Sequence, residues 1–202
     1  MTNFNGFKGA AKRLTDTDIP RIGHRIGVGE DELHAFMDVE SAGSGFDASG
    51  RPKMLFEPHV FYRNLSGDKR DRAVAAGLAY KSWIRGRYPK DSYPRLFSAM
   101  AIDETAALLA SSWGLTQILG ENHDECGYAT PQAMVLAFMD NEAAHLEAAV
   151  QFLISKHIED DLRAHRWNVV ARIYNGSGQV AYYAGELADR FAKWQRIKNT
   201  QL

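Results

Sequence analysis

Residues 33–46 of this chain read LHAFMDVESAGSGF and join an amphipathic segment to a glycine-rich turn. Leu33, Phe36 and Met37 follow the spacing of one helix face, which predicts a helix whose apolar side turns inward. Glu40 continues the same series and places a carboxyl group on that face, at the end of the helix. Burial and the negative end of the helix dipole both favour its protonated form. Glycosidic bond cleavage requires such a general acid, although a buried ion pair would explain the same pattern.

The composition is that of an ordinary globular protein, with a single domain over residues 1–202. Of the 202 residues 45% are hydrophobic and 24% are charged, so the chain can bury a sizeable core. Its net charge of −1 at pH 7 gives no support for a nucleic-acid partner. The single cysteine, Cys126, cannot form an intramolecular disulfide, so the fold is not expected to depend on oxidation.

Residues 1–14 carry basic side chains but no apolar run that could serve as a signal-peptide core. They are expected to form a flexible or loosely packed N-terminal extension. No later segment approaches the roughly 20 apolar residues of a membrane span, so no membrane-spanning helix is expected. Nothing in the sequence demands more than a monomer.

The hydrophobic periodicity predicts a mostly α-helical architecture with one small β element. Glycine and proline punctuation over residues 43–62 indicates a small β-hairpin or an irregular flap. Capping signals and apolar spacing predict helices over residues 18–25, 30–40, 71–83, 95–109, 130–153, 162–173 and 180–194.

Two further segments carry polar residues at glycine-marked boundaries. Residues 111–120 read SSWGLTQILG, and residues 172–178 read RIYNGSG. Taken alone, the first would be a helix-turn with a polar residue that faces water. The second would be a helix C-terminus in which asparagine and glycine accept the left-handed conformation.

The three segments, in this order, resemble the lysozyme-like superfamily of goose-type lysozymes and lytic transglycosylases. The resemblance is closer to the phage and prophage endolysin family of N-acetylmuramidases. Its patterns Val-Glu-Ser-x-Gly-x-Gly-Phe, Gly-Arg-Pro-x-x-Leu-Phe-Glu-x-His-x-Phe and Ser-Trp-Gly-x-x-Gln-Ile-x-Gly are present nearly complete, and the resemblance covers roughly residues 18–194. The resemblance implies a lysozyme-like α-helical domain with a small β-hairpin or flap beside the substrate groove. It also implies cleavage of the β-1,4 bond between N-acetylmuramic acid and N-acetylglucosamine in peptidoglycan.

Carried over position by position, the resemblance implies a role for each matching residue. Glu40 would be the catalytic acid, and Tyr174 would supply the hydroxyl group that orients it. Gln117 would line the groove, where its amide can donate to and accept from an N-acetyl sugar. Asn175 and Gly176 would shape the same wall of the groove.

A second carboxylate would decide the mechanism, and Glu57 is the first candidate. It lies among apolar residues in the stretch LFEPH, which is unusual for a carboxylate that faces water. A glycosidase with two carboxylates needs the second across the scissile bond, about 5 Å away in a retaining enzyme or about 6.5 to 9.5 Å in an inverting one. An ion pair with Arg51 or Arg63 is the structural alternative for Glu57. Asp47 is the competing carboxylate, although its FDASG context is typical of a turn.

Histidine and aromatic residues near these motifs are the remaining candidates for substrate contact. His59 follows Glu57 closely and could touch a sugar or pack within the flap. Trp113 could stack on a sugar ring, or lie in the core at the end of an apolar segment. Tyr88 and Tyr93 belong to a proline-bounded loop and are equally open to substrate contact and to packing.

No metal and no other cofactor is expected. The seven histidines show neither the His-Glu-x-x-His nor the Cys-x-x-Cys spacing of a zinc site. The only compact group, residues 123–126, is too isolated to indicate one.

Two alternatives to a muramidase stay open. A lytic transglycosylase would use Glu40 alone and release 1,6-anhydromuramyl products. A non-catalytic peptidoglycan-binding or phage structural protein would keep the groove without needing either carboxylate. An endolysin would be made in the host bacterial cytoplasm and act on peptidoglycan glycan strands in the periplasm, after a separate pore-forming protein had released it.

Overall fold

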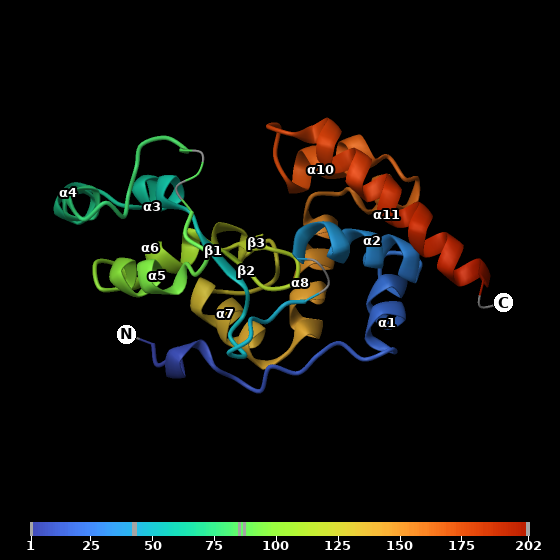
Figure 1. Ribbon diagram of the computed structural model, residues 1–202, viewed down its shortest axis with the longest axis horizontal. Coiled ribbons are helices and arrows are strands. Elements are labelled where there is room, and N and C mark those ends of the chain that lie inside the picture. Colours follow the sequence, from blue (N-terminus) through green and yellow to red (C-terminus); the bar gives the residue numbers. More distant parts are fainter. Residues whose placement is uncertain (1, 42–43, 85, 87, 201–202) are drawn as a thin grey trace.

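The computed structural model describes residues 2–41, 44–84, 86 and 88–200, and for Glu40 and Ser41 it describes the backbone alone. The elements in chain order are η1 (Asn5–Phe7), α1 (Asp18–His24), α2 (Glu30–Ser41), β1 (Met54–Phe56), α3 (Pro58–Asn64), α4 (Gly67–Ala75), α5 (Tyr93–Met100), α6 (Glu104–Leu109), β2 (Ser111–Trp113), β3 (Ile118–Leu119), η2 (Gly120–Asn122), α7 (Pro131–Asp140), α8 (Glu142–Ser155), α9 (Glu159–Arg163), α10 (Trp167–Tyr174) and α11 (Val180–Thr200). The mostly α-helical class with one small β element is therefore confirmed (Figure 1).

A small antiparallel sheet with the strand order β1-β2-β3 lies at the centre of the molecule (Figure 1). Met54 of β1 is opposite Trp113 of β2, and Trp113 is opposite Ile118 of β3. The sequence predicts β1 within the flap, but it predicts no strand in residues 111–120. Pairing with a distant segment makes those residues extended, and local periodicity does not report such pairing.

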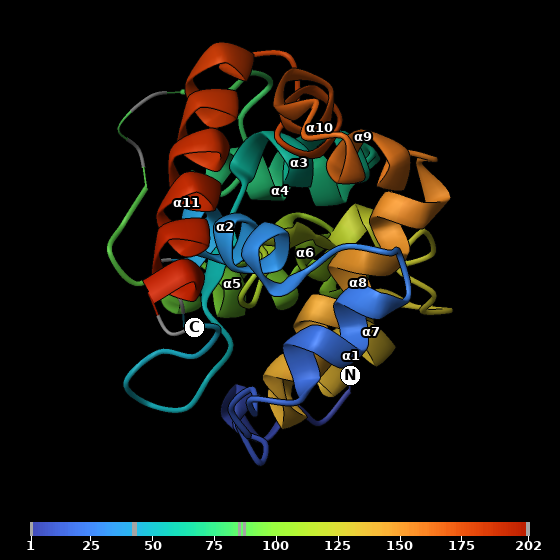
Figure 2. The ribbon, with the colours of Figure 1, turned by 90° about the vertical axis from the view of Figure 1, so that its right-hand side faces the viewer.

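Helices surround the sheet on two sides. In Figure 1, α3 to α6 lie to the left of the sheet, and α2, α10 and α11 lie to its right. The long helix α11 runs along α2 (Figure 2), where the indole N–H of Trp194 donates to the Asp38 carboxylate at 3.0 Å and the Trp194 ring stacks on His34 at 3.9 Å. The helices expected over residues 18–25, 30–40 and 180–194 are confirmed within a few residues at each end.

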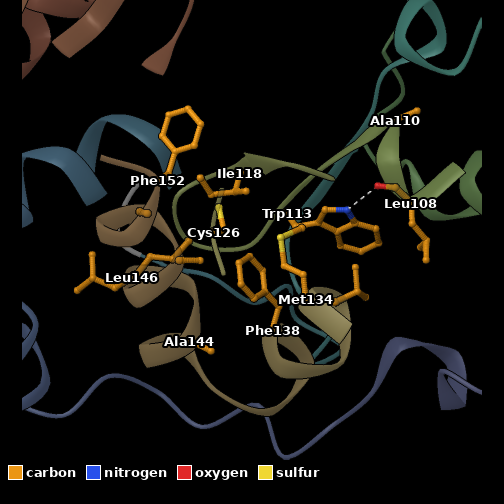
Figure 3. Packing of buried hydrophobic residues seen from close by; sticks show 14 of the residues in the cluster. Leu108, Ala110, Trp113, Ile118, Cys126, Met134, Phe138, Ala144, Leu146 and Phe152 are labelled. Carbon is orange, nitrogen blue, oxygen red and sulfur yellow. Dashed lines mark hydrogen bonds between the residues drawn. The ribbon is translucent and has the colours of Figure 1, made fainter. Parts of the chain in front are cut away.

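The central core lies between the sheet and the helices α7 and α8 (Figure 3). Trp113 and Phe138 are fully buried there, and the indole N–H of Trp113 donates to the carbonyl oxygen of Leu108 at 3.2 Å. Burying a large aromatic ring is strongly stabilising only when its polar atom finds a partner, and this hydrogen bond supplies one. Strand β2 is therefore anchored in the core through Trp113.

Three of the expected helices are each divided in two, and in two of them a capping side chain starts the second helix. Residues 95–109 divide at Asp103, and residues 130–153 divide at Asn141. Each of these side chains accepts a hydrogen bond from the backbone N–H three residues later, at 2.9 and 2.7 Å. An N-cap needs a non-helical backbone, so each cap starts a new helix in a new direction. The helix expected over residues 162–173 likewise divides into α9 and α10.

The helix expected over residues 71–83 is displaced, since α4 begins and ends earlier. Gly77 follows it with a φ of +68°, and the backbone N–H of Leu78 donates to the carbonyl of Ala73 at 2.9 Å. This is the glycine-terminated helix end expected of a left-handed C-terminal cap. The helix α3 is not predicted at all, although Pro58 in its first turn is a favourable start.

The N-terminal segment is packed rather than loose, so the expectation of a flexible extension is wrong. Phe4 and Phe7 are buried, their rings stack at 4.8 Å, and the Phe7 ring lies 5.6 Å from that of Trp113. Lys12 forms a parallel bridge to Asn141. Burial of the two phenylalanines stabilises the packed segment, and the expectation was wrong because it considered only the basic residues.

Candidate active site

A groove of about 700 Å3 opens between the small sheet and the helices α2, α8, α10 and α11. One wall comes from β1, α3, β2, β3 and η2, and the other from α2, α8, α10 and α11. Its lining residues are Val39, Leu55, Glu57, His59, Val60, Arg63, Ser112, Gln117, Ile118, Leu119, Asn122, Phe152, Ile173, Tyr174, Asn175, Gly176 and Tyr183. Five of the residues singled out from the sequence as catalytic or substrate-binding therefore share one groove.

The backbone of Glu40 belongs to the last turn of α2, directly after a residue that lines the groove, Val39. Its side chain lies outside the described residues. Leu33, Phe36 and Met37 are buried, as expected for the inward face of this helix. The helix that carries Glu40 is therefore fixed by the core, and it ends at the groove.

Glu57 stands between β1 and α3, and its side chain is 17% exposed. Its backbone N–H donates to the carbonyl of Ala110 at 2.8 Å, which holds the residue against the sheet. The hydroxyl group of Tyr88 donates to Glu57 Oε2 at 2.6 Å. His59 Nδ1 lies 3.4 Å from the same oxygen, a contact that would become an ion pair if the imidazole were protonated. The carboxylate is thus held at the groove by the hydrogen bond from Tyr88, with the imidazole of His59 close by.

Neither arginine proposed as an ion-pair partner of Glu57 takes that role among the described residues. Arg51 pairs with Asp47 and Asp91, and Arg63 pairs with Glu121. Both guanidinium groups are therefore committed to other carboxylates.

Asp47 has the opposite character, because its own turn occupies its carboxylate. Oδ1 accepts from the backbone N–H groups of Ser49 at 2.8 Å and Arg51 at 3.0 Å, and Oδ2 accepts from the Arg51 guanidinium at 2.7 Å. Burial alone would raise the pKa of Asp47, but the hydrogen bonds from Arg51 and Ser49 outweigh it and hold the pKa below its usual value. Asp47 lies in a second hollow of about 780 Å3, which meets the groove at Gln117.

Gln117 belongs to a tight turn between β2 and β3. Its φ of +50° is uncommon for a residue with a side chain, and Gly114 at the start of the turn has a φ of +75°. The Gln117 amide nitrogen donates to the carbonyl of Gly114 at 2.9 Å. The side-chain N–H is therefore directed toward the turn itself. Backbone conformations of this uncommon kind often occur at functional sites.

Tyr174 joins this turn to the opposite wall of the groove. Its hydroxyl group donates to the carbonyl of Thr116 at 2.8 Å, and its ring packs edge-on against Phe36 and Phe152 at 4.4 and 5.5 Å. Asn175 is the residue that ends α10, and it is followed by a glycine with a φ of +81°. The Tyr174 hydroxyl group thus donates its proton to a backbone carbonyl. Toward a protonated carboxyl group, the phenolic oxygen of Tyr174 would therefore act as a hydrogen-bond acceptor.

Two buried residues on α8, which the sequence did not indicate, support the turns that contain Gly45 and Leu115. Glu142 accepts from the backbone N–H of Gly45 at 2.8 Å and from the Arg13 guanidinium at 2.7 Å. The fully buried His145 accepts at Nδ1 from the backbone N–H of Leu115 at 2.9 Å. Burial lowers the pKa of His145 to about 4. Local periodicity places both residues on an apolar helix, and only the tertiary fold reveals their contacts.

Close packing against His145 explains why positions 45 and 114 are glycines. A Cβ atom at Gly45 or at Gly114 would lie 2.6 Å from His145 Nδ1. Only glycine lets both backbone segments approach the imidazole ring this closely. The glycine-rich motifs read from the sequence are therefore packing requirements of His145 as well as turns.

Two aromatic residues considered for substrate contact lie elsewhere. Trp113 is 0% exposed in the core, so the expectation that it binds substrate is wrong. Tyr93 is buried, and its hydroxyl group donates to the carbonyl of Pro52 at 2.7 Å. The alternation of a strand turns Trp113 toward the core, and this direction was hidden because β2 was not predicted.

Among the described residues, no group of three or more His, Cys, Asp or Glu side chains has the arrangement needed to hold a metal ion. In the same part of the chain, no helix combines the length and the apolar character needed to cross a bilayer.

The fold is thus mostly helical, with a small sheet beside a groove that Glu57 lines. The sequence profile of the N-acetylmuramidase family matches residues 30–195. The crystal structure of the Burkholderia AP3 phage endolysin is similar, with a TM-score of 0.80 and 36% sequence identity over 92% of this chain and 73% of that chain. No curated protein matches the sequence. The chain belongs to the N-acetylmuramidase family and is a glycoside hydrolase.

Proposed function

We propose that this muramidase is a phage or prophage endolysin that hydrolyses the β-1,4 bond between N-acetylmuramic acid and N-acetylglucosamine. The observation that carries the proposal is Glu57, a carboxylate held at a sugar-sized groove next to the end of the helix that bears Glu40. The similarity to a phage endolysin over 92% of the chain supports the biological role.

In this mechanism the two carboxyl groups divide the chemistry. Glu40 donates its proton to the glycosidic oxygen as the bond to the sugar C1 breaks. Glu57 accepts a proton from the attacking water, or stabilises the positive charge that develops at C1. After one turnover the proton gained by Glu57 and the one lost by Glu40 are exchanged with solvent.

Glu57 is favoured over Asp47 because of how their oxygens are engaged. Both oxygens of Asp47 accept hydrogen bonds from its own turn and from Arg51. Oε2 of Glu57 accepts from Tyr88, and the side chain lines the groove. A general base needs an oxygen that can reach water, so Glu57 meets the requirement better.

The remaining groove residues would position the glycan. The Gln117 amide nitrogen donates within its turn, so its amide oxygen is the atom that would accept from an N-acetyl N–H group. Tyr174 would orient the carboxyl group of Glu40, and Asn175 would shape the wall beside it. His59 would border the sugar site next to Glu57.

The cellular setting follows from the proposed role. The enzyme would act as a monomer on peptidoglycan glycan strands in the periplasm. It would be made in the host cytoplasm and reach the wall after a separate pore-forming protein had opened the inner membrane.

Replacement of Glu40 by Gln, assayed on purified sacculi, tests the proposal. The amide keeps the shape of the side chain but cannot donate an acid proton, so lysis should be abolished while the variant still sediments with sacculi. Circular dichroism should show that its fold is unchanged. Wild-type lysis by Glu40→Gln would contradict the catalytic assignment. A wild-type protein that sediments with sacculi but releases no soluble fragments would instead indicate a binding protein.

A lytic transglycosylase is the second candidate for the same groove, because Glu40 alone would suffice for it. In that reaction the C6 hydroxyl of the muramyl sugar replaces water, and Glu57 is dispensable. Full activity of Glu57→Gln, with anhydro products, would favour this candidate.

A further inference from the structure

Tyr88 is the one residue outside the β1–α3 segment whose side chain donates a hydrogen bond to Glu57 among the described residues. It belongs to the segment between α4 and α5, far from Glu57 in sequence, and its hydroxyl group reaches Glu57 Oε2 at 2.6 Å. That distance is short for a neutral hydroxyl donor and typical of a hydrogen bond to a charged carboxylate.

The contact makes the two oxygens of Glu57 unequal. Oε2 carries the Tyr88 hydrogen bond and has His59 Nδ1 at 3.4 Å. Oε1 is therefore the oxygen with which Glu57 would meet a water molecule. A carboxylate acts more effectively as a general base when a hydrogen bond fixes one of its oxygens. The other oxygen then keeps the orientation in which it can accept a proton from water.

Tyr88 is suited to remain a donor over the working pH range. Burial raises the pKa of its phenol, and the hydrogen bond to the Glu57 carboxylate raises it further. The charged or titratable groups that face this pair are His59 and Arg63 from α3, Glu121 from η2 through its pair with Arg63, and Arg95 from α5.

We propose that Tyr88 is a positioning residue that orients the Glu57 carboxylate for the attack of water. The inference rests on the proposed role of Glu57 as the second carboxylate. Tyr88 itself transfers no proton, and its effect is transmitted wholly through the hydrogen bond to Oε2.

Replacement of Tyr88 by Phe tests this inference, because the change removes only the hydroxyl group. The matched control is Tyr80→Phe, in which the lost hydroxyl donates to the backbone carbonyl of Gly77 in the same segment. We expect Tyr88→Phe to lower kcat about tenfold, the usual order for losing a hydrogen bond to a charged group, with little change in KM.

The outcomes separate this inference from the proposed function. Unchanged kcat in Tyr88→Phe, while Glu57→Gln is inactive, would overturn the role of Tyr88 and leave that of Glu57 standing. A rise in KM alone would also overturn it, since it would make Tyr88 a substrate contact. Full hydrolysis by Glu57→Gln would remove the proposed function itself. Thermal unfolding measures the stability of Tyr88→Phe and Tyr80→Phe, and a loss of kcat in Tyr88→Phe that only matches a loss of folded protein would overturn the role of Tyr88 as well.

Discussion

Asp47 precedes strand β1 in the chain and Glu57 follows it, and the two carboxylates differ in where their hydrogen-bond donors come from. Asp47 receives three hydrogen bonds, all from residues within its own turn. Glu57 receives its hydrogen bond from Tyr88, a residue distant in sequence, and it lines the groove. The local donors of Asp47 stabilise its turn, whereas the remote donor of Glu57 holds a carboxylate at the groove, where we propose that it acts in catalysis.

The largest effect should separate these two residues directly. We expect Glu57→Gln to lower the rate of sacculus hydrolysis about 100-fold to 10,000-fold, the usual contribution of a general base. Asp47→Asn should keep the rate within about threefold, because an amide oxygen can still accept from the turn. Turbidity clearing with equal amounts of folded protein measures both. The reverse ranking would make Asp47 the second carboxylate.

As the pH falls, the free energy of unfolding should decrease first because of a histidine and then, at lower pH, because of Asp47. The pKa of His145 is about 4 in the folded protein, and an unfolded histidine has a value near 6.5, so the unfolded state binds more protons between these limits. Stability should therefore fall by about 3 kcal/mol as the pH drops from about 6.5 to 4. His34 should add a smaller loss in the upper part of that window, because burial also lowers its pKa.

Asp47 should contribute in a lower window, since its pKa lies below the usual value. Its stabilisation is complete above the ordinary aspartate range and is lost as the pH falls through the folded pKa. Urea unfolding at a series of pH values measures both windows. A stability that is flat between pH 6.5 and 4 would contradict the buried neutral state of His145.

Removing the Asp47 acceptor should cost stability rather than activity. We expect Asp47→Ala to lower the free energy of unfolding by about 2 kcal/mol, because two backbone N–H groups and Arg51 lose their partner. Glu57→Gln should change it by less than about 1 kcal/mol, since the amide oxygen can still accept from Tyr88. Chemical denaturation compares the two. A larger loss for Glu57→Gln would mean that Glu57 is chiefly structural.

The smallest effect should appear at Gln117, where the groove meets the hollow that contains Asp47. We expect Gln117→Ala to raise KM about fivefold with kcat nearly unchanged, the size expected from one neutral hydrogen bond to the sugar. Steady-state kinetics on soluble glycan fragments measures it. An unchanged KM would show that Gln117 serves only its turn.

The sequence predicted a large part of this fold because its strongest signals are local. The apolar face of α2 and the Thr130–Pro131 start of α7 follow from spacing and capping alone. The helix breaks at Asp103 and Asn141 were missed because the apolar spacing continues through them, although both are good N-cap residues. Strand β2 could not be predicted, since it depends on pairing with a distant segment.

The groove was predictable to a similar degree. Glu57, Gln117 and Tyr174 all line the groove, and they could be named in advance because each belongs to a recognisable motif. Trp113 was misjudged because a single strand position decides whether a ring faces the core or the groove. Glu142 and His145 belong to no local motif, and their contacts with the turns arise only when α8 packs beneath them.

The most direct test of the two-carboxylate account is mass spectrometry of the muropeptides that the wild-type enzyme releases from purified sacculi. The account predicts products that end in reducing N-acetylmuramic acid, because water attacks C1 with the help of Glu57. Products that end in 1,6-anhydro-N-acetylmuramic acid, each lighter by one water, would contradict it and leave Glu57 without a role in catalysis.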